Sequence, residues 1–347
     1  MFDLTNYDPN SVGNPNNNIF GLPTDEDNAE LVIVPIPWEV TVSYSAGTAR
    51  APEAIFKASI QVDLFDPDMP DAWKKGYYMR PSDKKILMKS DYLRKEAELY
   101  IDYISKGDEV SANQFMTKTL KDVNEGSKFL NSWVYDQTHA LLERGKLVAL
   151  LGGDHSSPLG FMKAIGDKFG DFGILQIDAH FDLRKAYEGF NYSHASIMYN
   201  ALNEIPQLTK LVQVGIRDFG SDEWEMAQNS NGRVVSYLDR NIKIRQYEGE
   251  SWKTICEEIV EHLPQNVYIS FDMDGLDPKL CPNTGTPVQG GFETEQVFYL
   301  FRKVLESGRK LVAFDLNETG VGESDWDANV GARVLYKLCN LLVTSNS

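Results

Sequence analysis

The segment Phe172-Gly-Ile-Leu-Gln-Ile-Asp-Ala-His-Phe-Asp182 combines a short apolar run with a polar loop. The run is mostly apolar without strict alternation, which is typical of a strand covered on both faces of a parallel sheet. Carboxylates and an imidazole follow it directly. Because parallel sheets bind their ligands outside the carboxyl ends of the strands, the segment predicts an α/β fold with a polar site at one sheet edge.

Similar apolar runs recur along the chain, at Leu31 to Pro37, Lys146 to Leu151, Lys210 to Gly215, Asn266 to Phe271 and Lys310 to Phe314. Helical patterns that end at Gly or Pro lie before or after several of them, at 132–144, 252–263 and 295–307. This alternation indicates right-handed crossovers and a mostly parallel sheet with helices on both sides. We expect one domain over residues 1–347.

The segment from about 66 to 131 interrupts this alternation. It has mixed charge and helical stretches, but no convincing buried strand. We expect a helical insertion here. It is interpreted either as a solvated helical layer or as a lid or oligomer contact over the active site.

Charge and composition exclude several classes of protein. The 347 residues include 34 Lys and Arg against 51 Asp and Glu, a net charge of −17. This argues against binding to nucleic acid or to anionic lipid. No apolar stretch approaches the ~20 residues that span a bilayer, the N-terminus does not resemble a signal peptide, and Cys256, Cys281 and Cys339 are not spaced like a disulfide framework. We expect a cytoplasmic protein.

Three loops that follow apolar runs contain candidate metal ligands, namely residues 152–156, 178–182 and 272–278. The carboxyl ends of parallel strands share one sheet edge, so these loops can converge. Alternate residues of an extended segment point the same way, which groups the polar positions of 178–182 and likewise of 272–274. The candidates are His155, Asp178, His180, Asp182, Asp272 and Asp274.

Four buried carboxylates in one cluster would repel one another unless cations balanced them. One divalent ion leaves excess negative charge, whereas two offset all four. Carboxylate oxygens with a minority of imidazoles suit Mn²⁺, while Ni²⁺, Co²⁺ and Zn²⁺ stay open. Taken singly, each Asp could cap a helix or turn and each His could be a packed core residue. The three loops together favour a metal centre.

Gly-Gly-Asp-His-Ser (152–156), Asp-Ala-His-Phe-Asp (178–182) and Ser-Phe-Asp-Met-Asp-Gly-Leu-Asp-Pro (270–278) resemble the three signatures of the ureohydrolase superfamily of arginases, agmatinases and formimidoylglutamases. The loop Pro282-Asn-Thr-Gly-Thr-Pro287 also resembles a loop of that family. The resemblance implies an arginase-like, three-layer α/β/α sandwich around a sheet of about eight strands, assembled as a trimer or hexamer.

The resemblance also implies a role for each residue. His155 and Asp182 correspond to ligands of one Mn²⁺, His180 and Asp274 to ligands of the other, and Asp178 and Asp272 to bridging carboxylates. The implied reaction is attack of a metal-bridging hydroxide on a guanidinium carbon, which yields urea and an amine. His194 is the expected proton shuttle and Glu318 the expected guanidinium-binding carboxylate. With Asp182 they form the expected catalytic set.

The substrate is expected to be a cationic guanidino compound. Tyr192-Ser193-His194 resembles the agmatinase type more than the arginase loop, so agmatine is favoured. Arginase, guanidinobutyrase, guanidinase and formimidoylglutamase activities remain open. A zinc-dependent deacetylase, which needs one metal and leaves His155 without a role, and a non-catalytic scaffold are less favoured alternatives.

Overall fold

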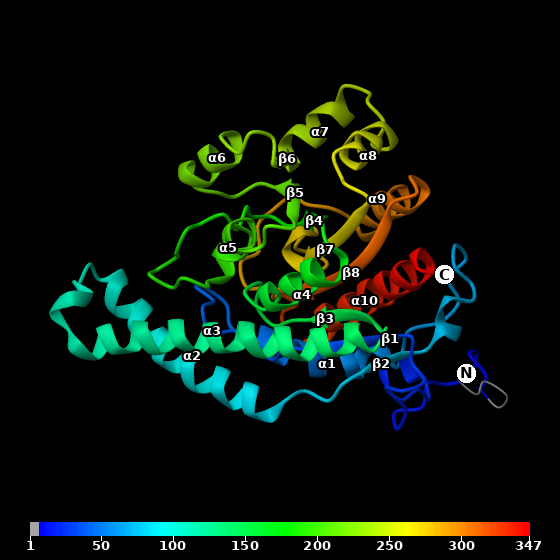
Figure 1. Ribbon diagram of the computed structural model, residues 1–347, viewed down its shortest axis with the longest axis horizontal. Helices are drawn as coiled ribbons and strands as arrows, with labels where there is room; N and C mark the ends of the chain where they lie inside the picture. Colours follow the sequence, from blue (N-terminus) through cyan, green and yellow to red (C-terminus); the bar gives the residue numbers. More distant parts are fainter. Residues whose placement is uncertain (1–6) are drawn as a thin grey trace.

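A computed structural model describes residues 7–347 and contains a sheet of eight parallel strands between two layers of helices (Figure 1). The strands run in the order β2-β1-β3-β8-β7-β4-β5-β6. They are β1 (Leu31–Pro35), β2 (Tyr77–Met79), β3 (Leu147–Leu151), β4 (Phe172–Ile177), β5 (Leu208–Ile216), β6 (Val234–Leu238), β7 (Asn266–Asp272) and β8 (Lys310–Asn317). The expected arginase-like, parallel α/β/α architecture is confirmed.

The two faces of the sheet bury separate apolar cores. In β3, Val148 and Leu150 contribute to one core, whereas Ala149 and Leu151 contribute to the other. Alternation of this kind explains why the strands are apolar at nearly every position: each face is covered by helices.

The first core lies under α2 (Lys84–Ser105), α3 (Gln114–Glu143), α4 (Leu159–Phe169), α5 (Ile197–Glu204) and α6 (Ser221–Gln228). The second lies under α1 (Ala51–Ser59), α7 (Asp239–Tyr247), α8 (Trp252–Glu261), α9 (Thr294–Glu306) and α10 (Trp326–Ser345). Short 3-10 turns connect these elements at η1 (Ile19–Gly21), η2 (Thr48–Arg50), η3 (Ala72–Lys75), η4 (Val110–Ala112), η5 (His194–Ser196) and η6 (Met273–Gly275).

The two outermost strands were not among the predicted apolar runs. β2 has only three residues and pairs with β1 alone, and β6 pairs with β5 at the opposite edge. Edge strands are short and need less apolar sequence, because one side has no neighbouring strand. Periodicity therefore located the six inner strands and missed these two.

The structure of the expected insertion differs from the expectation in two respects. It contains β2, and the expected boundary near 131 lies inside α3, whose C-terminal part is the helix expected at 132–144. The physical reason is a continuous apolar stripe along α3 that includes Val123, Leu130 and Val134, which gives the helix no point at which to end. Asp83 and Asn113 cap the starts of α2 and α3 through their side chains.

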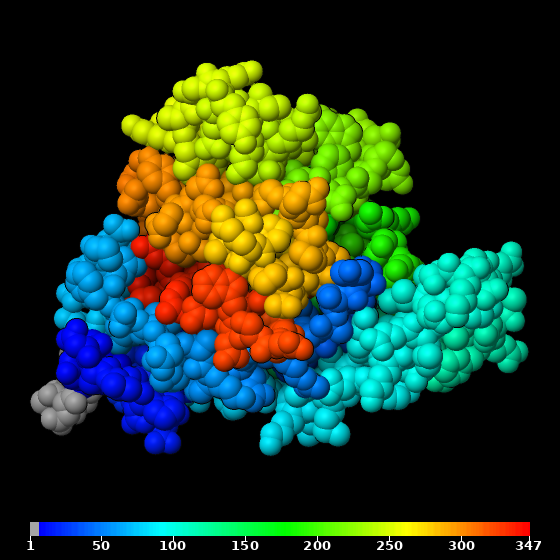
Figure 2. All heavy atoms as spheres, turned by 180° about the vertical axis from the view of Figure 1, so that it is seen from behind, coloured from blue at the N-terminus to red at the C-terminus, as the bar shows by residue number. Residues whose placement is uncertain are grey.

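We call α2 and α3 with their connection at 106–113 the helical hairpin. Its tip projects beyond the rest of the molecule (Figure 2). No helix within residues 7–347 is long and apolar enough to cross a membrane.

Candidate active site

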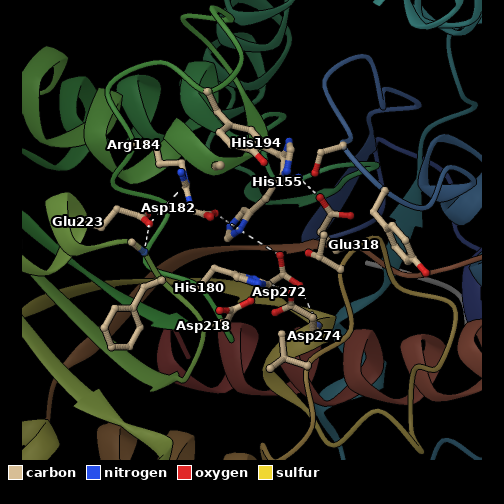
Figure 3. Close-up of a pocket in the computed structure, with 18 of the residues that line it drawn as sticks. His155, His180, Asp182, Arg184, His194, Asp218, Glu223, Asp272, Asp274 and Glu318 are labelled. Carbon is tan, nitrogen blue, oxygen red and sulfur yellow. Dashed lines mark hydrogen bonds and ion pairs between the residues drawn. The ribbon is translucent and has the colours of Figure 1, made fainter. Parts of the chain in front are cut away.

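A cavity of about 510 Å³ opens at the carboxyl ends of the strands. The loops after β3, β4, β5, β7 and β8 all contribute to its lining. Figure 3 shows the polar side chains that these loops direct toward one another. The predicted convergence of loops far apart in sequence at one sheet edge is therefore seen in the structure. The expected ligands and catalytic residues that line the cavity are His155, His180, Asp182, His194, Asp272, Asp274 and Glu318.

The loop after β3 depends on a glycine. A Cβ on Gly153 would lie 1.9 Å from the carbonyl oxygen of Trp38, so only glycine allows the two backbones to approach. The neighbouring Asp154 N–H donates to the same carbonyl at 2.8 Å. This contact brings the loop after β1 alongside the loop that contains His155.

A hydrogen bond to one ring nitrogen fixes the orientation of His155. Its Nε2 lies 2.9 Å from the Ser270 hydroxyl, which in turn donates to Asp315 Oδ1 at 3.0 Å. All three side chains are buried. A ring nitrogen fixed in this way leaves the other, Nδ1, aimed at the centre of the cluster.

Three carboxylates surround His155 Nδ1. Its distances to the Oδ2 atoms of Asp178, Asp182 and Asp272 are 3.1, 3.0 and 3.2 Å. The nitrogen nevertheless has no hydrogen-bond partner of acceptable geometry among the described residues. Donor atoms that face a shared point without bonding to one another are what a cation between them requires.

A second group of candidate ligands shares Asp178 with the first. His180 Nδ1 lies 2.9 Å from Asp274 Oδ2 and 3.6 Å from Asp178 Oδ1. The two oxygens of Asp178 therefore face different groups. The sets His155, Asp178, Asp182 and Asp178, His180, Asp274 can each hold a metal ion.

Turns, rather than strand alternation, direct these side chains. β4 ends at Ile177, and Asp178 Oδ1 then accepts the His180 N–H at 2.6 Å. Asp182 has a positive φ of 54°. Asp272 Oδ1 accepts the Asp274 N–H at 2.8 Å in the same kind of turn. The side chains converge as predicted, but for a different reason.

The donor set fits divalent cations, because carboxylate oxygens dominate and two imidazoles complete it. Without such ions, the ionised forms of the clustered carboxylates are unfavourable, and the pKa values of these side chains shift. Burial raises the pKa of Asp182 to about 7, and burial together with Asp274 raises the pKa of Asp272 well above its usual value. Against the opposing effect of burial, the facing carboxylates raise the pKa of His155 and of His180.

Buried glutamines extend behind Asp178, and sequence reasoning missed them. Gln176 Nε2 donates to Asp178 Oδ2 at 2.7 Å, and Gln213 Nε2 donates to Gln176 Oε1 at 2.7 Å. The Ser236 hydroxyl donates to Gln213 Oε1 at 3.1 Å. These residues are paired across β4, β5 and β6. The sequence did contain a signal for them, because Gln176 and Gln213 are polar residues inside otherwise apolar runs.

His194 begins the turn η5 beside the cavity. Its N–H donates to Thr41 Oγ1 at 3.0 Å, and its Nδ1 lies 3.4 Å from the same hydroxyl. Burial, followed by the charges of His180 and His155, lowers the pKa of His194 to about 3. Burial therefore favours the neutral form of the His194 imidazole.

Glu318 follows β8 with a positive φ of 60°. Its Oε1 accepts the His155 N–H at 2.9 Å, whereas its Oε2 is buried and has no partner within residues 7–347. Burial and the charge of Asp154 raise the pKa of Glu318. A cationic group next to Oε2 would restore the carboxylate. Thr286 and Pro287, from the loop at 282–287, line the cavity nearby.

Charged residues at the outer part of the cavity were not predicted. Arg184 Nε lies 3.5 Å from Glu223 Oε2, and its guanidinium stacks 4.7 Å from the Tyr187 ring centroid. Asp218 lines the same cavity and makes no ion pair with any described residue. Asp218 follows β5, so the strand-end argument used for the other loops would have found it.

A model of the arginase family matches residues 29–339, and the chain belongs to the arginase family of hydrolases. An N(1)-aminopropylagmatine ureohydrolase of Thermus thermophilus is 31% identical over 319 residues, 92% of either chain. An agmatinase of Cronobacter sakazakii is 30% identical over 304 residues, 86% of this chain and 81% of that one. The solved agmatine ureohydrolase of Thermoplasma volcanium is similar in fold, with a TM-score of 0.69, 22% identity and 92% coverage of both chains.

Proposed function

We propose that this protein is a binuclear-metal ureohydrolase that cleaves an amine-tailed guanidino compound, with agmatine favoured, to urea and an amine. The observation that carries the proposal is the pair of ligand groups that share the buried Asp178, beside a cavity whose wall includes Glu318. The family match and the names of the relatives support it.

The donor geometry supports two ligand groups that share Asp178, and the family resemblance implies Asp272 as a second shared carboxylate. His155 and Asp182 would hold one divalent ion and His180 and Asp274 the other, and we propose Mn²⁺ for both. Divalent ions bound there would supply Lewis acidity and lower the pKa of a water molecule enough to make it nucleophilic at neutral pH.

The remaining steps belong to the chain's own residues. Glu318 binds the guanidinium head through Oε2, which has no partner among the described residues. His194, whose imidazole is neutral beforehand, receives a proton from solvent water in the cavity at one imidazole nitrogen and passes it to the amine nitrogen as the carbon–nitrogen bond breaks. Thr41 holds the backbone and ring of His194 in place for this transfer.

The outer cavity favours a substrate tail that bears an amine. The cavity lining includes two carboxylates, Asp218 and Glu223, and one guanidinium, and that guanidinium already pairs with Glu223. An ammonium group would find Asp218 free, whereas a carboxylate tail would meet excess negative charge. This argument ranks agmatine or N(1)-aminopropylagmatine above arginine, 4-guanidinobutyrate and formiminoglutamate.

The direct test is urea release from each of these guanidino compounds, with formamide release for formiminoglutamate, before and after metal removal and Mn²⁺ addition. We expect amine-tailed substrates to react fastest and activity to depend on the metal. Preference for arginine would overturn the assignment of the tail. If none of these compounds gave a product, the proposed activity would be wrong and the non-catalytic scaffold would be favoured.

Asp218→Asn tests the tail assignment separately. We expect KM for agmatine to rise roughly 10-fold, because one charge-assisted contact is lost, and KM for guanidine, which has no tail, to stay unchanged. Asp222→Asn, an exposed neighbour, is the control. An equal effect on both substrates would place Asp218 outside the tail site.

A further inference from the structure

We propose that the helical hairpin positions His194, because its two helices hold the two loops between which this residue lies. One loop follows β1 and contains Thr41, and the other runs from Leu183 to Ser193 and leads into His194. The inference rests on the proposed function, in which His194 transfers the proton. It gives the hairpin a positioning role in catalysis.

Helix α2 anchors the first loop on both sides of Thr41. The Ser90 hydroxyl accepts the Glu39 N–H at 3.1 Å. Arg94 Nη1 donates to the carbonyl oxygens of Val42 and, at 3.5 Å, Val40. The Arg94 side chain is only 11% exposed. Since the carbonyls on either side of Thr41 are tied to α2, the hydroxyl that contacts His194 has a fixed position.

Helix α3 anchors the second loop through one side chain. Asn124 Oδ1 accepts the Asn191 N–H at 2.7 Å, and Asn124 Nδ2 donates to the Gly189 carbonyl at 3.2 Å. Between these two bonds lies Phe190, whose buried ring is 5.3 Å from that of Tyr100 on α2. Both helices of the hairpin therefore contact the segment 189–191, which ends three residues before His194.

The two anchors converge at His194. Thr41, held by α2, bonds to the His194 N–H and lies against Nδ1, whereas Asn124 on α3 fixes the chain that leads into His194. None of these contacts involves a candidate metal ligand. Loss of either anchor should therefore move the proton-transferring imidazole and leave the metal site intact.

The experiment uses Arg94→Leu and Asn124→Leu in the full-length, Mn²⁺-loaded protein. We expect kcat with agmatine to fall roughly 10- to 100-fold, because displacement of a catalytic group by about 1 Å is costly. KM and metal content should stay within about 2-fold. Glu98→Gln, at the ion-pair partner of Arg94, and Asp122→Asn, on α3, are the matched controls and should retain wild-type kcat.

A double-mutant cycle with His194→Asn separates positioning from general destabilisation. If the hairpin acts through His194, Arg94→Leu and Asn124→Leu should lower kcat less than about 2-fold in the His194→Asn background. If each hairpin variant lowers kcat by the same factor in the His194→Asn background as in the wild type, the proposal is overturned. Wild-type turnover in His194→Asn alone would overturn it as well, because no proton transfer would then depend on this residue.

Hydrogen–deuterium exchange gives a readout that does not require activity. We expect faster exchange in residues 187–195 in Asn124→Leu and in residues 39–42 in Arg94→Leu, with wild-type exchange elsewhere. Asn124→Asp keeps the acceptor for Asn191 and should restore most of the protection if the Leu variant is too unstable to purify. Unchanged exchange in both loops would overturn the inference. If the wild-type protein released no urea, the proposed function would be refuted, whereas the exchange data would still show whether the hairpin holds the two loops.

Discussion

Single buried groups govern the chemistry of the cavity. Glu318 has one oxygen occupied by the His155 N–H and one with no partner in the described part of the chain. A buried carboxylate with a free oxygen is unfavourable unless a cation completes it. The residue is thus suited to select a cationic head group.

Replacement of Glu318 by Gln should test this selection. The amide oxygen can still accept from His155, but an NH₂ group would replace the free oxygen and face the guanidinium. We expect kcat/KM to fall roughly 30- to 1,000-fold, or about 2 to 4 kcal/mol, for every guanidino substrate alike. Metal content should be unchanged. Glu323→Gln, exposed on the same loop, is the control. If kcat/KM fell for one substrate only, Glu318 would contact the substrate tail and not the guanidinium head.

Metal affinity should depend on pH through Asp182. Burial raises its pKa from 3.8 to about 7, so the metal-free folded protein holds this proton at pH 6, and the stability of the metal-free protein declines as pH rises from about 4 to 7. A metal must displace the proton. We expect the Mn²⁺ Kd, measured by calorimetry, to weaken as pH falls from 8 to 6, with proton release on binding. A pH-independent Kd would contradict this.

At the scale of secondary structure elements, three neighbouring strands act as one support for Asp178. The side chains of Gln176, Gln213 and Ser236 lie at matched register positions of β4, β5 and β6. Each donates to the next residue toward the site, and the last bond ends on Asp178 Oδ2. Second-sphere bonds of this kind orient a ligand and tune its charge.

Graded loss of metal affinity should follow from cutting this chain of bonds. We expect Gln176→Met to weaken Mn²⁺ binding roughly 10- to 100-fold, Gln213→Met less, and Ser236→Ala least, because each acts through the preceding amide. Equilibrium dialysis measures the effect. Gln228→Met, exposed on α6, serves as the control. Equal affinities in Gln176→Met and the wild type would show that the amide does not orient Asp178.

For the whole molecule, the sheet brings four carboxylates from two segments almost a hundred residues apart into one buried cluster. Their mutual repulsion opposes folding unless cations balance it. The structure of a single chain contains the whole cluster, so metal binding does not need a second copy. We propose in addition that the chain folds as one domain and forms a homo-oligomer, a trimer or hexamer, which sedimentation analysis can check.

Metal binding should therefore stabilise the whole fold. Free Mn²⁺ at about 100 times its Kd adds about 2.7 kcal/mol per site, so Tm should rise by several degrees. In Asp274→Asn the second site loses a charged ligand, and the increase should shrink. Calorimetry with and without Mn²⁺ measures both. An identical Tm in the two conditions would contradict a metal centre at this cluster.

Local sequence was sufficient for the inner strands and for the loops that contain the candidate ligands, because apolar runs and the polar residues directly after them are neighbours in the chain. The family resemblance supplied His194 and Glu318. Asp218, directly after a strand, and the glutamines, inside apolar runs, left local signals that were not used, whereas Thr41 and the hairpin contacts could not be predicted in this way. The bonds from Gln213 to Gln176 and from Asn124 to Asn191 depend on strand register and on helix packing between segments far apart in the chain. Only the tertiary structure sets such distances, since local patterns specify which elements form and not which side chains meet across them.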